Sequence, residues 1–107
     1  MKCQSFGSSS HLASFLSSKE SEIVAGNILD EYPTMKDAWI GLHDAKKTRR
    51  WRWTDSSTTN FRPWNRGEPN NQGGEEFCVY LSASAGFQKW NDGDCRTEMS
   101  YICKFSL

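Results

Sequence analysis

Four cysteines in a chain of 107 residues constrain the fold of this protein more than any other feature. They are Cys3, Cys78, Cys95 and Cys103. None belongs to a C-x-x-C pair, and the two histidines, His11 and His43, are not near them, which argues against a zinc site. An even number of cysteines in a short, loop-rich chain predicts two disulfides and an oxidising, extracellular compartment, and it leaves three pairings open.

The chain length suits a single domain, residues 1–107, with one modest core. The mean hydropathy is −0.72, so this core should be thin, and a few of the five Trp should supply much of it. The formal net charge is zero, which argues against nucleic acid or an anionic bilayer as a partner. We interpret the basic run at residues 46–52 as a solvated turn.

The first ten residues, MKCQSFGSSS, lack the apolar region of a signal peptide, and no stretch reaches transmembrane length. Because the cysteines favour secretion, we expect a mature domain that has been trimmed or that begins at an added Met. We expect no membrane insertion.

The sequence predicts an α+β fold in which one helix packs on an antiparallel sheet. Ser17 and Glu20 form a capping box at the start of a helix over residues 17–32, and Pro33 ends it. The predicted apolar stripe of this helix is Ile23, Val24, Ile28 and Leu29. The predicted strand-like runs are residues 10–16, 38–44, 50–55, 77–83 and 100–105.

Residues 50–55 alternate, which places Trp51 and Trp53 together on one face, interpreted as a core face. Residues 55–74 form a long irregular stretch with two isolated aromatic residues, Phe61 and Trp64. Such a stretch in a small domain is usually functional.

Two acidic segments, GEPNNQGGEEFC at 67–78 and WNDGDC at 90–95, raise the question of a hard cation. Calcium takes about six to eight oxygen ligands from carboxylates, amides and water. The candidate donors are Glu68, Asn70, Glu76, Asn91 and Asp92. A cis bond before Pro69 would turn the flanking side chains to one side. The alternative is a solvated acidic loop, and no EF-hand pattern is present.

The motifs WIGL (39–42), EPN (68–70), CVYL (78–81), WND (90–92) and YICKF (101–105) resemble the C-type lectin-like domain, especially its Reg/lithostathine and snake-venom lectin types. The resemblance spans nearly the whole chain. It implies the lectin fold, the disulfides Cys3–Cys103 and Cys78–Cys95, and a cis Pro69. It also implies one calcium site made by the five donors above, and the EPN motif goes with mannose-type sugars in this family.

The sequence departs from the pattern of this family in two places. Asp44 matches an acid of an auxiliary calcium site, but Thr48, Asn71 and Phe77 stand where further acids are expected, so we predict that this site is absent. The long loop should then depend more on Trp64 and Phe61 for order. The usual opening strand and most of a first helix do not precede Cys3. Either the start has been trimmed, or the partner strand of residues 101–105 is absent, which would leave an exposed edge that favours dimerisation or strand exchange.

The expected function is calcium-dependent binding of mannose-type glycans. Asn70 and Asn91 would donate to the oxygens of two neighbouring sugar hydroxyls, and Glu68 and Glu76 would accept their protons. The alternative is a calcium-independent, Reg-like domain that binds protein or glycan. We expect no enzyme, because carboxylates bound to calcium are poor proton donors. A homo-oligomer would supply the avidity that single lectin sites lack.

Overall fold

The computed structural model describes residues 10–44, 50–53, 57–59 and 61–105. Within these ranges, one helix, α1 (Ser18–Glu31), accompanies seven strands and two short 3-10 turns, η2 (Gln72–Gly74) and η3 (Ala83–Ala85). The strands are β1 (Ser10–Leu12), β2 (Ala38–His43), β3 (Arg52–Trp53), β4 (Glu76–Leu81), β5 (Trp90–Asp94), β6 (Ser100–Tyr101) and β7 (Cys103–Phe105). Helix and sheet together confirm the predicted α+β class.

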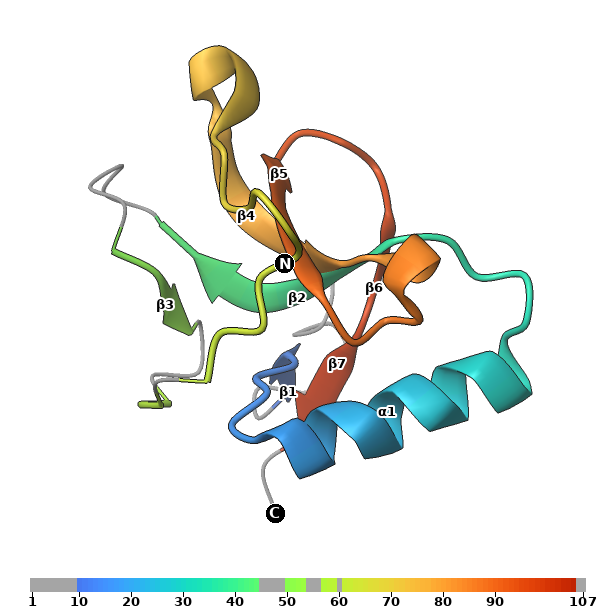
Figure 1. Ribbon diagram of the computed structural model, residues 1–107. Coiled ribbons are helices and arrows are strands. Elements are labelled where there is room, and N and C mark those ends of the chain that lie inside the picture. The colour runs from blue at the N-terminus through green and yellow to red at the C-terminus, as the bar shows by residue number, and fades with distance from the viewer. Residues whose placement is uncertain (1–9, 45–49, 54–56, 60, 106–107) are drawn as a thin grey trace.

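The main sheet has the order β3-β2-β4-β5, with antiparallel neighbours, and β6 pairs with β2 in parallel. The strands β2 and β4 lie in the middle of the sheet, and their buried apolar residues are Ala38, Ile40, Leu42, Val79 and Leu81. Helix α1 lies at one end of the molecule, whereas β4, β5 and η2 extend to the opposite end (Figure 1). No helix in the described ranges has the length and apolar content needed to cross a membrane.

The predicted single strand over residues 100–105 is two strands, β6 and β7, separated at Ile102. The Ile102 N–H donates to the Trp39 carbonyl at 3.2 Å, and the Ile102 carbonyl accepts from the Ala13 N–H at 2.7 Å. The run therefore leaves the main sheet at this residue and joins a second, two-stranded sheet.

The structure corrects the expectation of an exposed edge on residues 101–105, because one edge of β7 is paired with another strand. Strand β1 pairs with β7 in antiparallel register, with Ser10 opposite Phe105 and Leu12 opposite Cys103. Only residues 10–12 of the predicted 10–16 run are strand, and they supply the partner that seemed to be missing.

The predicted cap of α1 forms. The Ser17 hydroxyl accepts from the Glu20 N–H at 3.3 Å, and the Glu20 carboxylate reaches one residue further back than a capping box requires, to the Leu16 N–H at 2.9 Å. Both contacts satisfy N–H groups that have no partner within the helix. The helix ends at Glu31, two residues before Pro33, as predicted.

The predicted apolar stripe of α1 is partly wrong. Ile23 and Leu29 are 57% and 51% exposed, whereas the buried residues are Ser21, Ala25 and Ile28. Two of these three are small, so the helix packs closely on the core along a narrow strip that includes Ile28 and leaves Ile23 and Leu29 outside.

Trp90, at the start of β5, is fully buried and is the centre of an aromatic cluster. Its ring lies 5.5–6.4 Å, between centroids, from the rings of Phe15, Trp53, Phe61 and Trp64. Trp51 is half-buried and packs on Trp64 at 5.3 Å. These contacts confirm the aromatic core and the inward face of residues 51 and 53, and they dock the long loop on the sheet.

The backbone of the long loop is bonded to the same strand. The Trp90 N–H donates to the Pro63 carbonyl at 3.0 Å, and the Asn65 N–H donates to the Trp90 carbonyl at 2.8 Å. Because Phe61 and Trp64 bracket Pro63 and both pack on Trp90, this half of the loop is held beside the strand that carries the WND motif.

Candidate functional site

The two acidic segments meet at the end of the molecule opposite α1, where the long loop runs alongside β4 and β5 (Figure 1). The Glu68–Pro69 peptide is cis, the geometry that the resemblance implies. In the β4–β5 pair, Tyr80 lies opposite Asn91 and Val79 lies opposite Asp92, while a bulge separates Glu76 from Cys78. The loop, the start of β4 and the middle of β5 therefore supply the five candidate ligands.

Asp92 joins the loop to the sheet. Its side chain is almost fully buried, at 2% exposure, and its carboxylate oxygens accept from the Asn70 N–H at 3.1 Å and from the Asn71 N–H at 2.7 Å. Backbone N–H groups that bond to a buried carboxylate stabilise its charge. The sequence singled out Asp92 only as a metal ligand, but it also fixes the backbone that follows the EPN motif.

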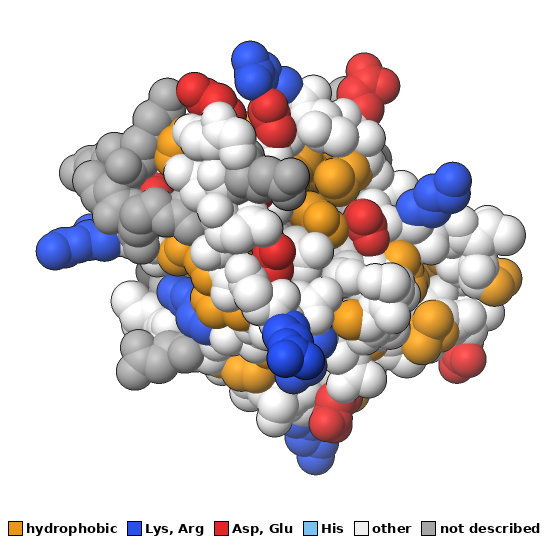
Figure 2. Space-filling view, turned by 45° about the horizontal axis from the view of Figure 1, so that its top comes forward, with side chains coloured by type: hydrophobic (Ala, Val, Ile, Leu, Met, Phe, Trp, Pro, Cys, Tyr) orange, Lys and Arg blue, Asp and Glu red, His pale blue; other side chains and the backbone are white. Residues whose placement is uncertain are grey.

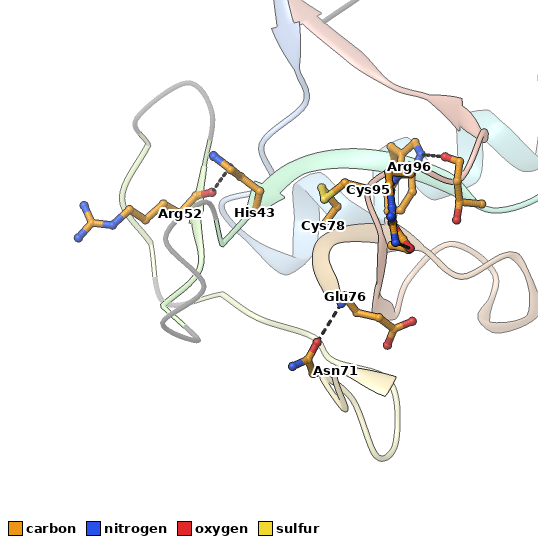
Figure 3. Close-up of a disulfide and its surroundings, with 10 residues drawn as sticks. His43, Arg52, Asn71, Glu76, Cys78, Cys95 and Arg96 are labelled. Atoms are coloured by element: carbon orange, nitrogen blue, oxygen red, sulfur yellow. Dashed lines mark hydrogen bonds and ion pairs between the residues drawn. A yellow bond between two sulfur atoms is a disulfide. The ribbon is translucent and has the colours of Figure 1, made fainter. Parts of the chain in front are cut away.

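Asn71 organises the turn after the EPN motif. It adopts a left-handed backbone conformation, with φ of 45°, which asparagine tolerates better than most residues. Its side-chain oxygen accepts from the Glu76 N–H at 2.8 Å, and its carbonyl accepts from the Gly74 N–H at 2.9 Å. Figure 3 shows the hydrogen bond from the Glu76 N–H to the Asn71 side chain, with the Glu76 side chain extending away from Asn71.

Glu68 lies against the carboxylate of Asp92. The pKa of Glu68 is raised from 4.5 to about 7, first by burial, then by the hydrogen bond and the charge of Asp92, with a smaller contribution from the charge of Glu76. The negative charge of a neighbouring carboxylate favours the protonated form of Glu68. A cation at this position would replace that proton.

Asn91 has a buried amide oxygen without a hydrogen-bond partner. Its amide nitrogen donates to the Tyr80 hydroxyl at 3.1 Å, so the amide is held at one end only. A buried carbonyl oxygen with no donor costs roughly 1–3 kcal/mol. A hard cation satisfies such an oxygen, and the neighbouring donors are oxygen atoms of the same kind.

The structure brings some of the predicted ligands together more closely than others. Glu68 and Asp92 are in contact, Asn70 reaches Asp92 through its backbone, and Glu76 acts on Glu68 through its charge. Within the described ranges, no three or more carboxylate, imidazole or thiol side chains converge in an arrangement that could hold a metal. The donor chemistry of the five residues nevertheless suits calcium, which binds carboxylate and amide oxygens.

One disulfide supports this region. Cys78 in β4 and Cys95 after β5 are bonded, with their Cα atoms 5.2 Å apart and a sequence separation of 17 (Figure 3). This confirms one implied pair. Cys103 is also disulfide-bonded, and its expected partner, Cys3, lies outside the described residues.

The predicted absence of the auxiliary calcium site stays a prediction. Asp44 is buried, and its N–H donates to the Phe77 carbonyl at 2.9 Å. Asn71 is engaged with Glu76, and Thr48 lies outside the described residues.

The surface around the site is not strongly basic. On the face in Figure 2, Lys and Arg side chains stand apart with acidic side chains between them. Residues 46–49 of the basic run lie outside the described residues, while Arg50 and Arg52 are exposed and Arg52 belongs to strand β3 rather than to a turn. The His43 ring lies 3.1 Å from the Arg52 carbonyl, which is a structural contact between β2 and β3, and the side chain of His11 is not described.

Comparison with known proteins gives one consistent family. The family described as the Lectin C-type domain matches residues 1–105. A C-type lectin of Micrurus corallinus is 45% identical over 102 residues, and a C-type lectin mannose-binding isoform of Oxyuranus scutellatus is 44% identical over 104 residues. These matches cover 95% and 97% of this chain and 65% and 66% of the two relatives, so the chain spans just under two thirds of their length.

The structure of human lithostathine superposes with a TM-score of 0.89 at 39% identity, covering 98% of this chain and 79% of that one.

Proposed function

This chain belongs to the C-type lectin domain family, and on that premise we propose that it binds mannose-type carbohydrate through one calcium ion. The residues proposed to hold the ion are Glu68, Asn70, Glu76, Asn91 and Asp92. Their oxygen donors suit calcium better than softer metals. The family consists of binding domains, which agrees with the expectation that the chain is not an enzyme.

The observation that carries this proposal is the buried, unpartnered oxygen of Asn91, the residue before Asp92. In addition, the pKa of Glu68 is raised by burial and by the neighbouring carboxylate of Asp92. Both features are unfavourable without a cation, and both are relieved by one. A merely solvated acidic loop has no reason to bury an amide oxygen and a carboxylate together.

The sugar would be bound by the side chains that hold the ion. When bound, calcium supplies open coordination positions for two neighbouring hydroxyl oxygens. Asn70 and Asn91 then donate N–H groups to those oxygens, while Glu68 and Glu76 accept the hydroxyl protons. In the order Glu68–Pro69–Asn70, an acceptor carboxylate stands before the proline and a donor amide stands after it. This arrangement of hydrogen-bond acceptor and donor would distinguish mannose-like from galactose-like hydroxyl pairs. The Oxyuranus relative is itself called mannose-binding.

The test measures calcium and sugar separately. Calorimetric titration with Ca²⁺ should show one site, and retention on a mannose matrix should end when EDTA is added. The variant Glu76→Gln should weaken both calcium binding and retention on mannose. The control Glu75→Gln, which changes an exposed residue outside the donor set, should leave both unchanged. Retention that persists in EDTA would contradict the calcium mechanism. The double variant Glu68→Gln with Asn70→Asp should shift preference towards galactose.

Two observations favour the calcium-independent alternative. The described carboxylates do not converge in threes, and the chain is similar to human lithostathine. This alternative predicts glycan or protein binding that is indifferent to EDTA and no heat in the Ca²⁺ titration. We also propose an extracellular location, on the ground of the Cys78–Cys95 disulfide.

A further inference from the structure

We propose that Tyr80 is a positioning residue for the calcium site, because it fixes the orientation of the Asn91 amide. The inference rests on the proposed function and deepens it. Tyr80 is not among the residues that the sequence motifs point to as ligands. The structure places its hydroxyl 3.1 Å from the Asn91 amide nitrogen, across the β4–β5 pair.

The ring of Tyr80 is held in place by its neighbours. Trp39 packs edge-on against it, with centroids 5.8 Å apart and planes at 82°, and the Trp39 ring N–H donates to the Thr97 carbonyl at 3.0 Å. Gly93, the next residue but one after Asn91, leaves the space that the ring occupies. A Cβ at position 93 would lie 3.0 Å from Tyr80 Cε1 and 3.1 Å from Trp39. The hydroxyl therefore has little freedom to leave Asn91.

The chemistry of the amide makes this contact directional. An asparagine side chain has one acceptor oxygen and two N–H donors. When one N–H is donated to Tyr80, rotation of the amide by half a turn would break that bond. The oxygen of Asn91, which has no other partner, is thereby kept on the side of the proposed ion, and the second N–H stays available for a sugar hydroxyl.

This arrangement predicts that loss of the Tyr80 hydroxyl affects calcium affinity and sugar affinity differently. Without Tyr80's hydroxyl, the amide must be oriented at the moment calcium binds, so calcium affinity should fall. Once the ion is bound, it holds the amide oxygen itself, so sugar affinity at saturating calcium should change little. A residue with only a packing role would lower both affinities together, through loss of folded protein.

The variant Tyr80→Phe keeps the ring against Trp39 and Gly93 and removes only the oxygen. We expect its calcium dissociation constant to rise about fivefold, the worth of one hydrogen bond of about 1 kcal/mol. Its mannose affinity at saturating calcium should stay within about twofold. Tyr32→Phe, an exposed tyrosine at the end of α1, is the matched control and should change neither constant. Unchanged calcium affinity in Tyr80→Phe would overturn the proposal.

A measurement without calcium separates this inference from the proposed function. In metal-free wild-type protein, NMR of the Asn91 side chain should show one amide proton shifted and protected from exchange with water, and the other not. Tyr80→Phe should remove that difference. If the two protons exchange alike in the wild-type protein, the positioning role is wrong even when calcium binds; if they differ and no calcium binds, only the proposed function fails.

Discussion

Replacement of Asp92 by Asn tests whether the loop is held by the protein itself rather than by an ion. Asp92 accepts the Asn70 and Asn71 N–H groups in a buried position, and each such bond to a charged group is worth about 1.5–3 kcal/mol. An asparagine keeps one acceptor oxygen and turns an NH₂ group towards the other donor. We therefore expect Asp92→Asn to lower the free energy of unfolding by about 2–4 kcal/mol.

The assay is thermal unfolding in calcium-free buffer, at a pH below the Glu68 pKa of about 7, so that repulsion between the two carboxylates does not contribute. For a domain of this size, the expected loss lowers the melting temperature by about 8–16 °C. Asp94→Asn on the same strand is the control. Asp94 pairs with the exposed Arg96, and surface ion pairs contribute little. An Asp92→Asn protein that melts like the wild type would refute the reasoning.

Three further predictions follow from the same region. The raised pKa of Glu68 means that the folded, metal-free protein binds more protons than the unfolded chain between pH 4.5 and about 7, so its stability should fall as the pH rises through this window. Calcium must displace that proton, so calcium affinity should rise over the same window, and Glu68→Gln should flatten both pH profiles. Gly93→Ala should cost about 1–3 kcal/mol in urea unfolding, because its Cβ would press on Tyr80; an unchanged midpoint would mean that the ring yields freely. Replacement of Cys78 and Cys95 by Ser should cost about 3 kcal/mol for a sequence separation of 17, measured by the same denaturation, and an unchanged midpoint would contradict the stabilising role of this bond.

The sequence predicted the elements whose signals are local. The Ser17 cap, the strand at 38–43 and the aromatic face of residues 51 and 53 depend on neighbours in the chain, and each is confirmed. The exposed faces of α1 could not be predicted in the same way. Which face a helix buries depends on how closely it approaches the sheet, and here small side chains allow that approach along a strip that excludes Ile23 and Leu29.

The parts of the site that the sequence missed are the contacts between distant segments. The break at Ile102 arises because its N–H and its carbonyl bond to two different sheets, which no alternation pattern reveals. Likewise, the sequence assigned Asp92 and Asn71 by their place in motifs. Their hydrogen bonds to Asn70, Asn71 and Glu76 depend on how the loop folds back on the strands. Trp90 was noticed only as part of the WND motif, although it is the centre of the core.

These contacts separate two roles within the proposed ligand set. Asp92 holds the loop through its side chain, so Asp92→Asn should lose calcium binding and metal-free stability together. Glu76 is bonded to the loop through its backbone N–H, which Glu76→Gln retains. That variant should therefore lose calcium affinity while its loop keeps the link to Asn71, visible as unchanged NMR shifts of the Asn71 side chain in metal-free protein. If both variants disturb the loop equally, the ligands act as one unit and the loop depends on the whole set of charges. If they differ as expected, the loop is preorganised before the ion arrives, and less binding energy is spent on ordering it.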